Sequence, residues 1–179
     1  MRVLLRQSLV VVGAAWFTLA IGGCSGSTST ASDQTTPADS IGALEDSGEI
    51  PKLDRSPDAG GPDTNNDGVR DDVETYIQAN YSTEPRRAAA RQHAAVIRAA
   101  ILVDKNDAAS VKRVSIRGSR AVRCIYQQFD GTSGQKPAEV VEKIRAVSTN
   151  TKVRLKAYLA YAKALDGTSR TRPEGDTCE

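Results

Sequence analysis

The sequence predicts a small all-α domain, a bundle of about four to five helices. Between about residue 73 and residue 165, apolar residues recur at intervals of three and four, the spacing that aligns them along one face of a helix. Glycine and proline fall between these stretches, and no segment of comparable length alternates as a β-strand does. At 179 residues the chain has room for one modest domain.

Each expected helix has a residue suited to its first turn, where a Ser, Thr or Asp oxygen can accept from a free N–H and proline already has a helical φ. The expected starts are Asp71, Ser82 or Thr83, Asp107, Pro137, and Thr149 or Asn150. Pro85 would lie in the first turn of the second helix. Gly131 and Gly134 break the chain before the fourth helix, and Gly167 ends the last. The core-facing side chains are expected to be Val73, Tyr76 and Ile77; Ala89, His93, Val96, Ile97, Ala100 and Ile101; Val111, Val114, Gly118, Ala121, Val122, Ile125 and Phe129; Val140, Val141, Ile144 and Val147; and Leu155, Tyr158, Leu159, Ala162 and Leu165.

The first 23 residues have the composition of an export signal. Arg2 and Arg6 supply a positive start, and residues 9–21 form an almost unbroken apolar run. This run is too short to span a bilayer as a helix, which takes about 20 apolar residues. Residues 1–23 are therefore expected to be a signal peptide.

The apolar run ends in Ile21-Gly22-Gly23-Cys24, which resembles the lipobox of bacterial lipoproteins. The resemblance implies that Cys24 is acylated and becomes the first mature residue, although Gly22 stands where alanine or serine is commoner. Ser25 follows the cysteine in place of aspartate, which in the family's sorting pattern implies the outer membrane, facing the periplasm. The alternative is an ordinary cleaved signal beside an unmodified cysteine.

Residues 24–62 are expected to be a flexible, acidic tether. Residues 25–40 are mostly Ser, Thr, Ala and Asp and offer almost nothing to bury, so they favour disorder. Residues 41–62 add acidic side chains, prolines and glycines among scattered apolar residues, and are expected to run as extended chain along the domain.

The remaining two cysteines form an even pair in an oxidising compartment, once Cys24 is assigned to the lipid. A disulfide between Cys124 and Cys178 would restrain the unfolded chain by about 4 kcal/mol. It would also hold the polar carboxyl-terminal segment, residues 168–179. The alternative is two free thiols.

Residues 63–74 follow the spacing of a twelve-residue calcium-binding loop. The expected ligands, at positions 1, 3, 5, 7, 9 and 12, are Asp63, Asn65, Asp67, the carbonyl of Val69, Asp71 and Glu74. Calcium prefers six to eight oxygen ligands, and glycine at position 6, here Gly68, permits the sharp turn that brings them together. The sequence therefore predicts calcium as a cofactor.

The same loop resembles an EF-hand loop, and more closely the loops of dockerins and thrombospondin type-three repeats, which share the aliphatic residue at position 7 and aspartate at position 9 (Val69 and Asp71). Two features depart from an EF-hand. Arg70 replaces the usual aliphatic residue at position 8, and Pro62 precedes the loop in place of an entering helix. The resemblance therefore implies a structural ion rather than a sensor. The alternative is an acidic turn that caps a helix.

Charge is strongly polarised along the mature sequence. Residues 25–75 hold 12 acidic and 3 basic side chains, whereas residues 76–179 hold 10 acidic and 19 basic ones. A basic ridge is expected on the third helix, formed by Lys112, Arg113, Arg117 and Arg120. Its candidate partners are anionic lipid headgroups, cell-wall polymers or the protein's own acidic segment, and the alternative is a solvated helix face. Nucleic acid is not expected, because no groove-reading motif is present.

No catalytic constellation is recognisable in the sequence. The single histidine, His93, lies among apolar positions without a paired nucleophile and is expected to be a packed, hydrogen-bonded core residue. The sequence thus predicts a non-enzymatic, lipid-anchored envelope protein in which a calcium loop at residues 63–74 joins the tether to a helical domain at 75–179. The alternative is an adaptor that binds an anionic envelope ligand through its basic helical face.

Overall fold

The computed structural model describes residues 36–131, 134–169, 171 and 173–179. The expected signal peptide, the lipidation site at Cys24 and the first part of the expected tether lie outside these residues.

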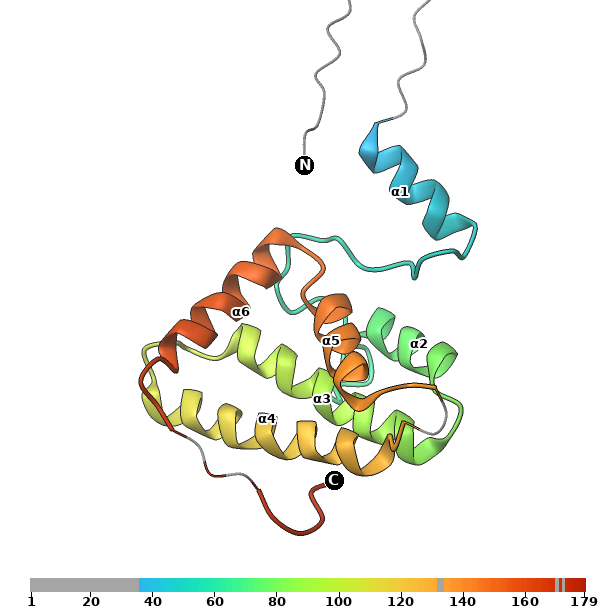
Figure 1. Cartoon of the computed structure of the whole chain (residues 1–179). Coiled ribbons are helices and arrows are strands. Elements are labelled where there is room, and N and C mark those ends of the chain that lie inside the picture. The colour runs from blue at the N-terminus through green and yellow to red at the C-terminus, as the bar shows by residue number, and fades with distance from the viewer. Residues whose placement is uncertain (1–35, 132–133, 170, 172) are drawn as a thin grey trace, which may run out of the picture. The chain divides into compact units, whose positions relative to one another are not determined.

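The described residues form six helices and no strand, which confirms the all-α prediction (Figure 1). In chain order the helices are α1 Pro37–Asp46, α2 Asp71–Asn80, α3 Glu84–Leu102, α4 Ala108–Gln128, α5 Pro137–Ser148 and α6 Lys152–Ala164. Among these described segments, no helix has both the length and the apolar character needed to cross a bilayer.

Helix α3 lies at the centre of the bundle, where α2, α4, α5 and α6 all pack against it (Figure 1). Its inner face is lined by small residues such as Ala89 and Ala90, both fully buried, which lets the neighbouring helices approach closely. At Gly118 on α4, a Cβ atom would lie 3.4 Å from a methyl group of Val96, so α4 packs closely against α3 at this point. The ring of Phe129, fully buried after α4, meets the Tyr81 ring edge-on with 5.3 Å between centroids.

The segment before residues 63–74 is more ordered than the flexible tether that the sequence predicts. Residues 37–46 form α1, favoured by Pro37 in its first turn and by the Asp39 carboxylate beside its amino end, although none of its residues is buried. Residues 51–62 have neither helix nor strand, and Leu53 and Ala59 pack against the core.

The predicted inward face of α6 is partly wrong. Leu155 and Leu159 are 45% and 55% exposed, whereas Arg154 is completely buried. The Arg154 guanidinium pairs with the Asp54 carboxylate and donates to three backbone carbonyls, those of Asp54 (2.6 Å), Asp58 (2.9 Å) and Ala59 (3.3 Å). These bonds fix the rotation of α6 about its axis and turn the two leucines outward.

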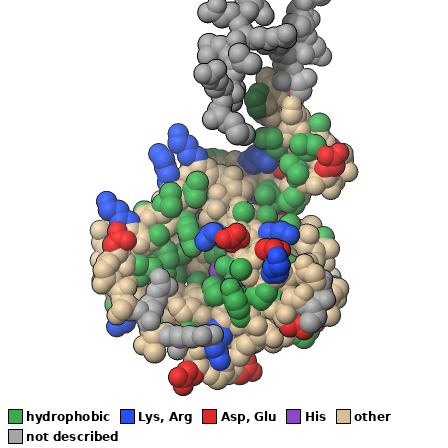
Figure 2. Space-filling view, in the orientation of Figure 1, with side chains coloured by type: hydrophobic (Ala, Val, Ile, Leu, Met, Phe, Trp, Pro, Cys, Tyr) green, Lys and Arg blue, Asp and Glu red, His purple; other side chains and the backbone are tan. Residues whose placement is uncertain are grey.

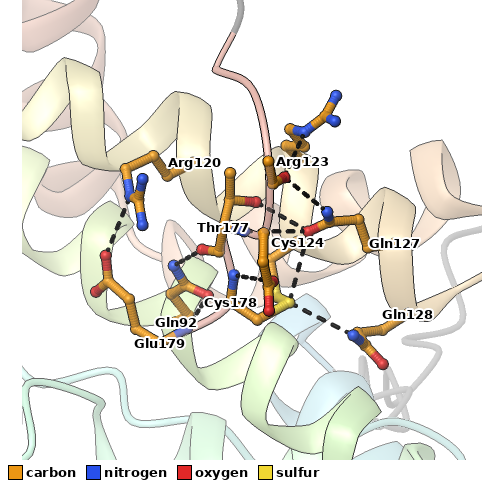
Figure 3. The surroundings of a disulfide bond; sticks show 11 residues. Gln92, Arg120, Arg123, Cys124, Gln127, Gln128, Thr177, Cys178 and Glu179 are labelled. Carbon is orange, nitrogen blue, oxygen red and sulfur yellow. Dashed lines mark hydrogen bonds and ion pairs between the residues drawn. A yellow bond between two sulfur atoms is a disulfide. The ribbon is translucent and has the colours of Figure 1, made fainter.

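The predicted disulfide between Cys124 and Cys178 is present, with 4.9 Å between the Cα atoms (Figure 3). It fastens the carboxyl-terminal segment to α4, as expected. Polar contacts support it: the Gln92 amide on α3 donates to the Thr177 carbonyl at 2.9 Å, and Arg120 pairs with Glu179 at 3.4 Å. The Thr177 side chain is consequently buried beside α4.

Candidate metal centre

The loop of residues 63–74 runs into α2, whose first turn holds its last four residues. The Asp71 N–H donates to the Pro62 carbonyl at 3.0 Å, which brings the start of α2 back beside the residue that precedes the loop. Within it, Asn66 and Gly68 have positive φ angles of 59° and 86°, so the backbone turns sharply at the position where the calcium pattern requires glycine. The Gly68 N–H donates to an Asp63 carboxylate oxygen at 3.1 Å across the turn.

Three of the predicted ligand side chains converge on one point. The side-chain amide of Asn65 donates to the Asp67 carboxylate at 3.1 Å and to the Glu74 carboxylate at 3.2 Å. The side chains at loop positions 3, 5 and 12 are therefore in direct contact through Asn65. Burial raises the pKa of Glu74, and the Asp67 carboxylate beside it raises that pKa further. Asp67 and Glu74 are therefore close enough to repel each other, which a bound cation would relieve.

Asp63, the expected first ligand, has an oxygen available for an ion. Its Oδ1 atom is buried and has no hydrogen-bond partner among the described residues. Its other oxygen, Oδ2, lies 3.2 Å from the Arg98 guanidinium on α3. A buried carboxylate oxygen without a partner is costly, so the donor set fits a hard cation that would complete it.

Asp71 and Val69 have additional roles within the loop. Both Asp71 carboxylate oxygens accept from Thr64, one from the N–H at 2.9 Å and one from the hydroxyl at 2.6 Å, and these bonds lower the pKa of Asp71. The Val69 side chain is 2% exposed and packs in the core, which anchors the loop. In the described part of the chain, no three histidine, cysteine or acidic side chains form a ready-made metal cluster. The expected cage would therefore also need the neutral oxygens of Asn65 and Val69.

Arg70 is the residue at this site whose role the sequence did not reveal. It stands at position 8, where an EF-hand has an aliphatic residue, yet it is only 4% exposed. It pairs with Asp72 at 2.5 Å and donates to the Val147 carbonyl at 3.1 Å and the Ser148 carbonyl at 3.3 Å. Asp72 also accepts from the Asp54 N–H at 2.7 Å, so its carboxylate is engaged away from the loop ligands.

No known protein family, curated protein or solved structure matches the chain. The oxygens of Asp63, Asn65, Asp67 and Glu74 are hard donors of mixed charge on a tight turn, which suits a calcium ion better than magnesium, since magnesium demands near-ideal octahedral geometry and retains its waters.

Proposed function

We propose that this protein is a calcium-binding, lipid-anchored envelope protein with a structural, non-catalytic role. In this proposal the ion binds the loop of residues 63–74 and fixes the path of the chain between the lipid anchor and the helical bundle. Two observations carry it: the side chains of Asn65, Asp67 and Glu74 converge, and the same loop holds a buried, unpartnered oxygen of Asp63.

The structural role follows from how firmly the loop is joined to the bundle. Val69 and Val73 are buried in the core on either side of Arg70, Asp63 pairs with Arg98 on α3, and Arg70 donates to carbonyls at the end of α5. An ion that stiffens the loop would therefore stabilise the contacts of α2 with both helices. Binding energy at the loop would appear as folding stability of the whole bundle.

The calcium proposal is tested by unfolding and calorimetry with and without calcium. For a lone loop in an exported protein we expect an affinity of about 10⁻⁴ to 10⁻³ M. At a hundredfold excess of free ion over that constant, the free energy of unfolding should rise by about 2.7 kcal/mol. Glu74→Gln removes one charge and the bidentate grip while keeping the side-chain size, so it should abolish this rise.

In calcium-free buffer, Glu74→Gln should be as stable as the wild type or slightly more stable, because it removes the repulsion from Asp67. The matched control is Glu142→Gln, the same substitution at an exposed side chain on α5, which should keep the full calcium response. Calorimetry without heat at millimolar calcium, or a Glu74→Gln protein that responds like the control, would show that the loop is only an acidic helix cap.

The lipid anchor has its own test at Cys24. Cys24→Ala should move the protein from the membrane fraction to the soluble fraction, or leave its precursor unprocessed. Mass spectrometry of the wild-type amino terminus should find acyl chains on Cys24. Wild-type protein that is soluble and unacylated would refute the anchor while leaving the calcium proposal untouched.

A second candidate function is that of an adaptor for an anionic envelope ligand. It is favoured by three exposed cations on α4, namely Lys112, Arg113 and Arg117. Two further arginines of this helix, Arg120 and Arg123, contact the carboxyl-terminal segment instead. Retention on isolated cell wall that is lost in a variant with all three exposed cations changed to glutamine would support the adaptor role. Calcium dependence of that retention would join the two functions.

A further inference from the structure

Helix α6 packs one side against the bundle and leaves the opposite side exposed. Arg154 and Tyr161 are buried on the inner side. Leu155 and Leu159 are 45% and 55% exposed, and at a spacing of four residues they lie in one row on the outer side. This row is an apolar strip that the bundle does not cover, in contrast to the single surface leucines that soluble proteins commonly have.

The same outer side carries three lysines that form a second row beside the leucines. They are Lys152, Lys156 and Lys163, all exposed and without an ion-pair partner among the described residues. No acidic residue occurs between Glu142 and Asp166, so no carboxylate of the helix itself offsets their charge. Figure 2 shows hydrophobic and basic side chains together over α6. The outer side of α6 is therefore both apolar and positively charged.

The acidic residues near the end of α1 do not neutralise these lysines. Glu45 pairs with Arg55 at 2.7 Å, and Asp46 pairs with Lys52 at 3.2 Å. The charge of the outer side of α6 is thus available to a partner.

This combination of rows selects an anionic membrane surface as the partner. If two copies of the chain met through α6 by two-fold symmetry, the lysines of one copy would oppose those of the other. A bilayer with anionic headgroups suits both rows, because its phosphates attract lysines and the leucines can enter the boundary between headgroups and acyl chains. Lysine can also bury its aliphatic stem there while its ammonium group stays in water.

The chain from the expected lipid anchor joins the bundle at the amino end of this helix. The Asp54 carboxylate and carbonyl are both bonded to the Arg154 guanidinium. Asp54 follows Cys24 by about 30 residues, and a chain of that length spans at most about 100 Å even when fully extended. An anchor at Cys24 would therefore keep α6 at a high effective concentration near the bilayer, so that even a weak contact forms.

We propose that the outer side of α6 docks on an anionic phospholipid bilayer, with Leu155 and Leu159 at the level of the headgroups and the three lysines against the phosphates. The contact lays the bundle on the membrane instead of leaving it free at the end of its tether. The inference rests on the proposed lipid anchor for proximity, but docking of α6 needs no acyl chain, so the two proposals can fail separately.

The test uses the expected mature chain, residues 24–179, carrying Cys24→Ala, which cannot be acylated and contains all six helices. The probes are vesicles of equal parts phosphatidylglycerol and phosphatidylcholine, and vesicles of phosphatidylcholine alone. In sedimentation, the anionic vesicles should bind the chain at least about tenfold more tightly, and added salt should weaken this binding.

A tryptophan placed on α6 reports directly on the contact. The one natural tryptophan, Trp16, lies in the expected signal peptide, so the mature chain has none. The emission of Leu159→Trp should move to shorter wavelength when anionic vesicles are added, because the indole leaves water. Tyr126→Trp, at a residue that is 54% exposed on α4, is the matched control and should not shift.

Two further variants separate the apolar row from the charge. The double variant Leu155→Ser with Leu159→Ser should weaken binding about tenfold. Changing the three α6 lysines to glutamine should weaken it about tenfold or more. The charge-matched control changes Lys112, Arg113 and Arg117 of α4 to glutamine and should stay within about threefold of the unmodified mature chain. Circular dichroism should confirm that each variant is folded.

The proposal is overturned if Leu159→Trp shifts no more than Tyr126→Trp. Equal losses from the α6 and α4 glutamine variants would overturn it too, because the vesicles then respond only to net charge. Dimers in solution that the double serine variant separates would show that a second copy covers this side. Acyl chains on wild-type Cys24 without vesicle binding by α6 would refute this inference alone, whereas vesicle binding with an unacylated Cys24 would refute only the anchor.

Discussion

Replacing Arg154 by methionine should show how much one buried charge contributes to this fold. Methionine keeps most of the side-chain length but removes every donor. Wild-type Arg154 is completely buried, and its guanidinium serves the Asp54 carboxylate, the Asn150 side chain and three backbone carbonyls. After the substitution those carbonyls lose a donor, and Asp54 keeps only its bonds from the Ser56 N–H and hydroxyl.

The expected loss can be worked out from the exposure of the two partners. Removing one member of a buried ion pair costs about 3–5 kcal/mol, because an uncompensated charge stays buried. The Asp54 side chain is still 22% exposed, so water partly solvates it, and the loss belongs at the lower end, about 3 kcal/mol. Asp54→Asn keeps an acceptor oxygen and should cost about 1 kcal/mol. The double variant should lose less than the two single losses together.

The dependence on pH gives a second check. Partial burial raises the pKa of Asp54, but the hydrogen bonds from Arg154 and Ser56 outweigh this and hold it below its unfolded value of 3.8. The stabilisation is therefore fully present above pH 3.8 and is lost as the pH falls through the lowered folded pKa. The difference between wild type and Arg154→Met should shrink in acid.

Urea unfolding followed by circular dichroism measures these differences, provided that the denaturant slope is unchanged. Arg117→Met, at an exposed arginine on α4, is the matched control and should change stability by less than about 0.5 kcal/mol. A loss below 1 kcal/mol for Arg154→Met, or a loss that is the same at pH 7 and in strong acid, would refute the reasoning.

Three further predictions concern the backbone, the disulfide and the buried histidine. Gly61 has a φ of +64° and a Cβ there would collide with the Arg70 side chain, so Gly61→Ala should lower the melting temperature more than Gly131→Ala, where φ is +80° and the space is open. Cys178→Ser opens a loop of 54 residues and should lower the free energy of unfolding by about 4 kcal/mol, and a wild type that unfolds at the same urea concentration with and without reductant would contradict this. Desolvation lowers the pKa of His93 from 6.5 to about 4, so between these pH values the unfolded chain binds more protons than the folded chain. The free energy of unfolding should therefore fall by about 3 kcal/mol as the pH drops from 6.5 to 4. In His93→Leu this pH dependence should disappear.

The parts of the fold that depend on neighbouring residues could be predicted from sequence. Asp107 caps α4 as expected, because its carboxylate accepts from the Ser110 N–H at 3.0 Å, only three residues away. Pro85 likewise lies in the first turn of α3. The loop residues Asn65, Asp67 and Glu74 converge for the same reason, since a twelve-residue spacing and a turn at Gly68 bring them together locally.

The parts that depend on distant partners could not be predicted. Apolar periodicity placed Leu155 and Leu159 inside because it counts arginine as a surface residue, yet Arg154 is buried by a carboxylate 100 positions earlier in the chain. Arg70 departs from the EF-hand pattern, but the pattern does not indicate its partners, because its bonds to the end of α5 span 77 and 78 positions. Neither pairing leaves a periodic signal in the sequence.

The hydrogen bonds between Arg154 and residues 54–59 also determine how the protein responds to mechanical force. A pull on the amino-terminal side of the chain reaches Asp54 before it reaches the loop of residues 63–74. There the tension passes into α6 through the Arg154 guanidinium, which holds Asp54, Asp58 and Ala59 together. To separate residues 54–59 from α6, the buried Arg154 guanidinium must break its hydrogen bonds to all of these acceptors. Part of the load also reaches the loop of residues 63–74 directly, because the Asp54 N–H donates to Asp72.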